Sequence, residues 1–173
     1  MDMNDVLKLM LNSGAAEEVG KKTGLSMTDA AEIMEDVLPM LLKGMQGQAT
    51  NKQTQDSFLK ALTDHSKDDT SDIGKFIKNV DTDDGAKIVN HLLGSQKEEL
   101  AAKAKAKRKS AVDTKTVLKI MAILAPLLMS KMGSQATAKK AAKSSSNDMV
   151  DIVSGLLDGV DAGDVLKIVS KLI

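Results

Sequence analysis

Apolar residues recur three and four positions apart along most of the chain, the spacing that places side chains on one face of an α-helix. Val, Ile and Thr never alternate with polar residues over the length of a strand. The pattern therefore predicts an all-α fold, a compact multi-helix bundle. Helices are expected at about 3–12, 15–22, 26–45, 58–65, 73–77, 81–93, 95–109, 113–132, 148–157 and 162–172.

Short polar side chains stand before several of these helices, where they can accept hydrogen bonds from the first free backbone N–H groups. Ser26, Asp81 and Asp113 are the predicted N-caps of three helices. Gly94 is predicted to end the helix that Asp81 begins. Residues from about 133 to 147 are rich in Lys, Ala and Ser, and we expect them to form a flexible linker.

Two stretches of the chain are each repeated further along it. Residues 26–50 align without a gap with residues 113–137, and eight of the 25 positions are identical. Residues 73–93 align in the same way with residues 153–173, with seven of 21 positions identical. Because the two matches follow the same order at similar offsets, the sequence predicts an internal A-B-A′-B′ duplication.

Pro39 and Pro126 occupy equivalent positions in the repeated long helices. A proline inside a helix removes one backbone hydrogen bond and its ring clashes with the carbonyl four residues earlier, which bends the helix. We therefore expect two proline-kinked central helices that cross in the middle of the molecule. Ala122 and Ala125 are expected to let the backbones approach there.

The composition defines the core and excludes several kinds of site. A chain of 173 residues can bury a sizeable core, so the two halves, 1–94 and 95–173, are expected to pack as one domain. Leu, Ile, Val, Ala and eleven Met must fill that core, because the chain has no Trp or Tyr and only Phe58 and Phe76. The absence of Cys removes disulfides, thiolate metal sites and thiol nucleophiles. No cofactor is expected.

The sequence predicts a cytoplasmic protein without a membrane span. The first five residues are acidic, where a secretory signal would be basic. The longest apolar run, residues 120–129, is about half of the roughly 20 residues that cross a bilayer, and Pro126 interrupts it. We interpret this run as a core helix.

The charges are unevenly distributed, although the chain as a whole is neutral. The net charge is −6 over residues 1–96, +9 over residues 97–143 and −3 over residues 144–173. Such asymmetry indicates either charged partners or pairing within the molecule.

The basic middle contains a tract that is a candidate for contact with nucleic-acid phosphates. Its members are Lys103, Lys105, Lys107, Arg108 and Lys109. No aromatic residue lies among them to stack on bases and the chain has a single Arg, so only weak, non-specific nucleic-acid binding is expected. The alternative is a solvated helix that pairs with the acidic N-terminal half.

The most specific motif is Gly-x-x-Ile-Val-x-His-Leu-Leu-Gly, whose defining residues here are Gly85, Ile88, His91 and Gly94. With the proline-containing stretches at 37–42 and 124–129, it makes about residues 1–133 resemble the bacterial domain-of-unknown-function family DUF 937. That family is related in fold to the YidB-like helical proteins. The resemblance implies an all-helical bacterial fold and supplies no activity, substrate or catalytic residue.

The polar residues offer few candidates for catalysis or metal binding. His91 is either an acid, base or ligand, or a side chain favoured by the helix dipole at a helix C-terminus. An EF-hand loop beginning at Asp81 would need Gly and Glu where Ala86 and Leu92 stand, so the acidic cluster is interpreted as a helix cap.

We therefore expect a non-enzymatic helical scaffold that binds an unknown protein partner or itself. The alternative is a non-specific DNA-associated protein that uses the basic segment 103–109.

Overall fold

The computed structural model describes residues 8, 14–107, 112–141 and 155. Throughout these residues every regular element is a helix, which confirms the all-α prediction. The elements are α2 (Ala15–Thr23), α3 (Met27–Thr50), α4 (Gln55–His65), α5 (Ile73–Asn79), α6 (Thr82–Leu93), the 3-10 turn η1 (Gly94–Gln96), α7 (Lys97–Ala106) and α8 (Thr114–Ala141). The helices expected at 3–12, 148–157 and 162–172 lie outside the described residues.

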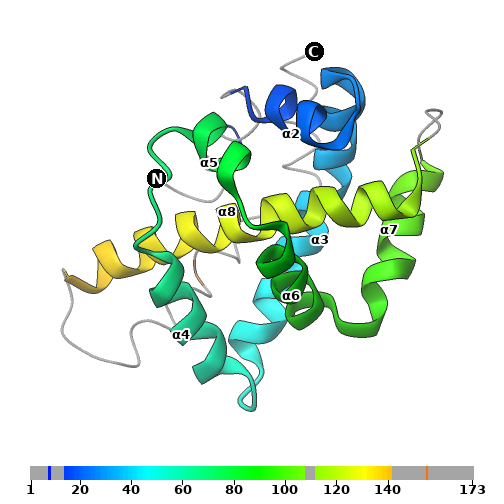
Figure 1. The fold of residues 1–173 in the computed structure, drawn as a ribbon. Helices are drawn as coiled ribbons and strands as arrows, with labels where there is room; N and C mark the ends of the chain where they lie inside the picture. Colours follow the sequence, from blue (N-terminus) through cyan, green and yellow to red (C-terminus); the bar gives the residue numbers. More distant parts are fainter. Residues whose placement is uncertain (1–7, 9–13, 108–111, 142–154, 156–173) are drawn as a thin grey trace.

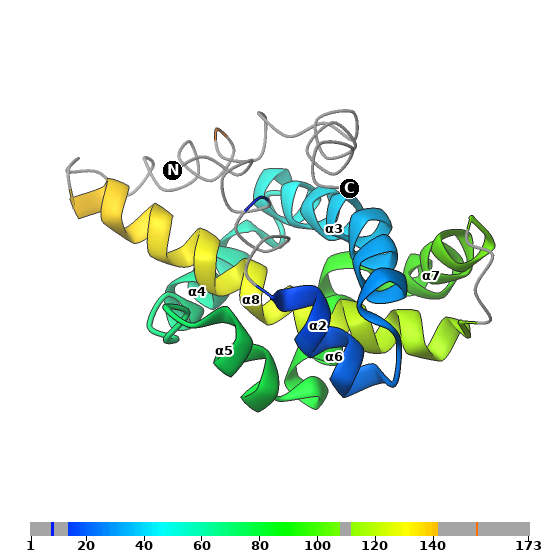
Figure 2. The ribbon, with the colours of Figure 1, turned by 90° about the horizontal axis from the view of Figure 1, so that it is seen from above.

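The helix α8 is the element around which the others are arranged. It runs across the whole described structure, and α3 crosses it steeply (Figures 1 and 2). Each of the other described α-helices contacts α8. Residues 120–130 of α8 are all buried, the environment expected of a helix that is apolar on every side. The interpretation of the apolar run as a core helix agrees with this burial.

Leu, Ile and Met side chains fill the core, as the composition predicts. The largest of the completely buried side chains come mainly from α3 and α8 and include Leu38, Leu41, Met45, Ile120 and Met121. Both α3 and α8 continue through their internal prolines.

The predicted N-caps are confirmed. The side-chain oxygen of Ser26 accepts from the backbone N–H of Asp29, and that of Asp113 accepts from the backbone N–H of Thr116. Asp81 Oδ1 accepts from two backbone N–H groups at the start of α6. These bonds hold the pKa of Asp81 below its usual value, because they stabilise the carboxylate.

The prediction of a flexible linker from about residue 133 is wrong for residues 133–141, which continue α8 to Ala141. Gly133 is buried where α8 passes close to the end of α4, and a methyl group at Gly133 would overlap the carbonyl oxygen of Leu62. Ala136 is completely buried as well. Tertiary packing thus outweighs the weak helix propensity of the glycine.

We predict that Gly133→Ala destabilises the protein by about 1–3 kcal/mol, because the added methyl group overpacks the contact with α4. Gly47→Ala is the matched control: Gly47 lies in α3 with open space where a methyl group would stand. This control should be neutral or stabilising by up to about 1 kcal/mol. Urea unfolding checks both variants, and equal stabilisation by the two substitutions would contradict the close contact.

The cap at Asp81 predicts a dependence of stability on pH. Its pKa is lower in the folded protein than the ordinary value of 3.8, so the stabilisation is complete above that pH and is lost as the pH falls through the folded-state pKa. Asp81→Asn keeps a capping oxygen that does not titrate. The stability difference between the parent protein and this variant should therefore shrink on acidification from pH 7 to pH 3, measured by thermal unfolding. A difference that grows would contradict the assignment.

Candidate functional site

Gly85 of the signature motif fills a structural requirement. It is buried in α6, and a methyl group there would overlap the carbonyl oxygen of Ala122 in α8. Pro126 explains why this carbonyl is approachable, since proline has no N–H to donate to the residue four positions earlier. The backbone that approaches Ala122 here is that of α6. The expected close approach of the two long helices at Ala122 and Ala125 stays a prediction.

The other glycine of the motif, Gly94, ends α6. Its φ of 53° lies in the left-handed region, which glycine adopts without steric cost, and its N–H bonds to the carbonyl of Asn90. Ile88 is half-buried against the core. Three of the four motif residues are thus accounted for by helix packing and helix termination.

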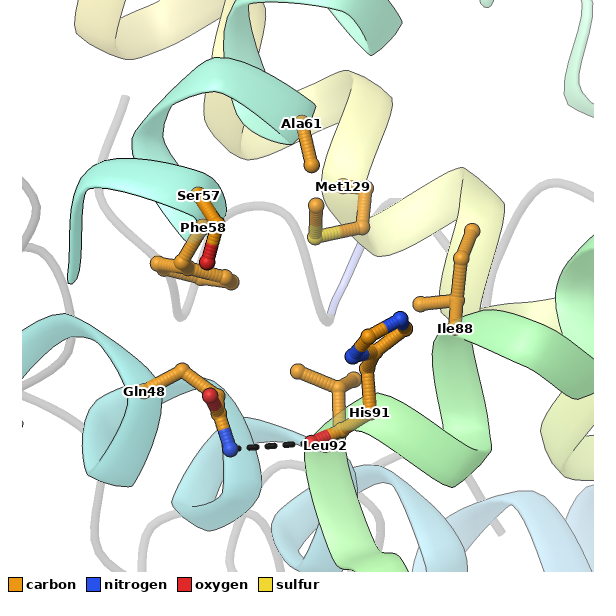
Figure 3. Close-up of a pocket in the computed structure, with 8 residues that line it drawn as sticks. All are labelled: Gln48, Ser57, Phe58, Ala61, Ile88, His91, Leu92 and Met129. Atoms are coloured by element: carbon orange, nitrogen blue, oxygen red, sulfur yellow. Dashed lines mark hydrogen bonds between the residues drawn. The ribbon is translucent and has the colours of Figure 1, made fainter. Parts of the chain in front are cut away.

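His91 lies at the edge of an apolar hollow of about 140 Å³ at the C-terminal end of α6 (Figure 3). Its side chain is exposed, and its imidazole ring projects into the hollow. The hollow is lined by Gln48 of α3, Ser57, Phe58 and Ala61 of α4, Ile88, His91 and Leu92 of α6, and Met129 of α8. Gln48 Nε2 donates to the backbone carbonyl of His91 at 2.9 Å, which ties α3 to the end of α6.

The hollow is lined mainly by apolar groups. Its surface is mostly carbon, and its polar side chains, Gln48, Ser57 and His91, include a single titratable group. A catalytic histidine is normally paired with a nucleophile or oriented by a carboxylate. No carboxylate lines this hollow. The site can accept an apolar side chain with one hydrogen-bonding partner at its rim.

The described part of the basic tract is largely engaged with acidic residues. Lys103 Nζ lies 2.6 Å from Glu99 Oε1 along α7, and Lys107 Nζ lies 3.2 Å from Asp36 Oδ1 of α3. Lys105 is exposed. Arg108 and Lys109 lie outside the described residues.

Three lysines outside the tract donate to backbone carbonyls of the fold. Lys22 Nζ donates to the carbonyls of Ile77, Lys78 and Val80 at the C-terminal end of α5, at 3.0–3.1 Å. Lys119 Nζ donates to the carbonyl of Lys22, and Lys131 Nζ to that of Thr70. Burial lowers the pKa of both Lys22 and Lys131, because it penalises the charged form. These cations act as structural donors.

A partly buried polar cluster links α4, the loop after it and α8, and the sequence pattern did not predict it. Asp68 Oδ2 is hydrogen-bonded to His65 Nδ1 at 2.9 Å and accepts from Ser130 Oγ at 2.7 Å. In a catalytic triad the histidine stands between serine and carboxylate, whereas here the carboxylate stands between the other two. Ser130 is also completely buried. The sequence signal that could have indicated this cluster is the serine at position 130, directly after the apolar run 120–129.

No group of three or more His, Asp or Glu side chains that could hold a metal ion occurs among the described residues. One described helix, over Thr114–Ala138, is long and apolar enough to cross a membrane by length and composition alone. Its most apolar window is 78% buried inside the fold, as in the core helix of a globular protein.

The buried Gly85 and the exposed His91 of the signature motif are expected to respond differently to substitution. Gly85→Ala should destabilise the protein by about 1–3 kcal/mol or more, because its methyl group meets backbone that cannot rotate away. His91→Ala should change the urea midpoint little, since the side chain is exposed. A large loss of stability in His91→Ala would show that the histidine is a packing residue.

Comparisons with known proteins give one match. No curated protein and no solved structure matches the chain. The model of the family described as "Bacterial protein of unknown function (DUF937)" matches residues 5–135. This range includes α2 to α7, most of α8 and the whole signature motif. The chain therefore belongs to the bacterial family DUF937, as its sequence resemblance implied.

Proposed function

We propose that the protein is a non-catalytic helical scaffold that binds another protein, or a second copy of itself, through the apolar hollow beside His91. The observation that carries this proposal is the contrast between a bonded polar cluster in the fold and the accessible, mostly apolar surface of the hollow. The polar side chains of His65, Asp68 and Ser130 are bonded to one another, whereas the hollow leaves carbon surface and the imidazole of His91 accessible. A surface of this kind suits an apolar side chain of a partner.

The duplication and the proline bends support a scaffold role and form part of the proposal. Equivalent long helices, α3 and α8, cross near the centre, and each contains a proline at the aligned position. A shared bend would set the angle at which the two copies pack. We further propose that the protein acts in the cytoplasm, because its lack of cysteine fits a reducing compartment.

Two measurements with a matched pair of variants test the scaffold proposal. Ala61→Glu adds one negative charge inside the hollow, and Lys75→Glu, which changes the charge by −2, places a glutamate on the exposed surface of α5. Self-association by light scattering and protein capture from the source bacterium should both be measured. We expect Ala61→Glu to lose the interaction and Lys75→Glu to retain it. Identical behaviour of the two variants, or no interaction by the parent protein, would contradict the proposal.

The second candidate is non-specific DNA association through the basic tract. Lys105 is exposed, which favours it, while the pairing of Lys103 with Glu99 and of Lys107 with Asp36 weakens it. Phosphate contacts release counterions, so affinity that depends on them falls steeply with salt.

We predict weak duplex binding at about 50 mM salt that vanishes at about 200 mM, measured by fluorescence anisotropy. Glu99→Gln should strengthen the low-salt binding, because it frees Lys103 from its ion pair. Neutralising Lys103, Lys105, Lys107, Arg108 and Lys109 together should abolish it. Submicromolar duplex binding at physiological salt that this variant loses would rank DNA association above the scaffold role.

A further inference from the structure

The hollow beside His91 has the size of one aromatic ring. Its volume is about 140 Å³, close to the roughly 150 Å³ of an engineered cavity, lined by Leu, Ile and Phe in another protein, that binds benzene. Pockets for cofactors and drug-sized ligands measure about 300–1,000 Å³, at least twice this volume. A single six-membered ring therefore fits the hollow, whereas a nucleotide does not.

The walls of the hollow offer contacts that an aromatic ring makes better than an aliphatic side chain. The ring of Phe58 and the thioether of Met129 line it from α4 and α8 (Figure 3). Two aromatic rings attract each other beyond the effect of the area they bury, and a thioether sulfur makes favourable contacts with a ring. Ile88 and Leu92 of α6 add aliphatic surface. These walls favour a ring as the occupant.

The polar groups at the rim suit a ring that carries a hydroxyl. Ser57 Oγ donates its hydrogen to the carbonyl of Thr54 at 2.7 Å, so towards a ligand it can only accept. The imidazole of His91 projects into the hollow and has both a donor and an acceptor nitrogen in its neutral form. A phenol hydroxyl can donate to one of these groups and accept from the other.

The two ends of the hollow are held by contacts between helices. At one end Gln48 Nε2 of α3 donates to the carbonyl of His91. One helical turn beyond the lining residues of α4 and α6, His65 Nε2 of α4 lies 4.0 Å from Asp84 Oδ2 of α6. The site is therefore formed before a ligand arrives, which lowers the entropic cost of binding.

We propose that the hollow binds the side chain of a tyrosine presented by another protein. The inference rests on the proposed function and names the chemistry of the partner. A second copy of the chain cannot supply this side chain, because the sequence contains no Tyr. Of its two aromatic residues, Phe58 lines the hollow itself and Phe76 is half-buried against the core.

Three small molecules test the ring and the hydroxyl separately. p-Cresol is the side chain of tyrosine, 4-methylcyclohexanol has the same heavy atoms without the aromatic ring, and toluene has the ring without the hydroxyl. Binding to the full chain is followed by NMR of ¹³C-labelled methionine methyl groups, with the signal of Met129 assigned from Met129→Leu. The other methionine signals show whether each variant is folded.

We expect p-cresol to shift the Met129 signal and to bind about three- to tenfold more tightly than 4-methylcyclohexanol. Ala61→Leu fills the hollow and should abolish the shift. The double variant Ser57→Ala and His91→Ala should weaken p-cresol more than toluene, because toluene makes no hydrogen bond. Equal affinity for p-cresol and 4-methylcyclohexanol would overturn the proposal. So would an unshifted Met129 signal, or binding that Ala61→Leu leaves intact.

The results separate this inference from the proposed function. A partner that Ala61→Glu loses, together with no preference for p-cresol, would overturn the tyrosine and leave the interaction surface standing. Binding of p-cresol in the hollow with no partner captured by the parent protein would contradict the proposed function and leave the ring-binding site standing.

Discussion

The fold depends on the close passage of other helices across the backbone of α8. A helix buried over residues 120–130 has to satisfy its backbone groups without water, and Pro126 leaves the carbonyl of Ala122 without its helical donor. Gly85 brings the backbone of α6 against that carbonyl, and Gly133 brings α8 against the carbonyl of Leu62. These contacts fix how α4 and α6 approach the central helix, and the hollow beside His91 lies between those two helices.

The polar residues of the interior serve this packing. Ser130 and His65 meet at the carboxylate of Asp68, so that the loop after α4 is held to α8. Lys22, Lys119 and Lys131 donate to carbonyls where helices end or loops turn. A polar group that is bonded in this way rigidifies the fold. The hollow beside His91 lies at the surface, where mostly carbon atoms line it together with the polar side chains of Gln48, Ser57 and His91.

The two halves of the molecule use similar helices for different purposes. The acidic N-terminal half contributes Asp36, which pairs with Lys107 of the basic tract. Part of the charge asymmetry is therefore neutralised inside the molecule. The helix α8 is more deeply buried than α3, since Pro126 is buried and Pro39 is half-exposed.

The sequence alone determined the helical class, the caps at Ser26, Asp81 and Asp113, and the family, because helical periodicity, capping and a motif are local signals. Tertiary structure decided the end of α8, where packing of Gly133 against α4 overrides a linker-like composition. It also decided the partners of Lys107 and Ser130, which are 71 and 62 positions away in the chain. The hollow beside His91 likewise combines residues of four helices. Such contacts depend on how distant helices approach, and spacing along one helix does not encode that approach.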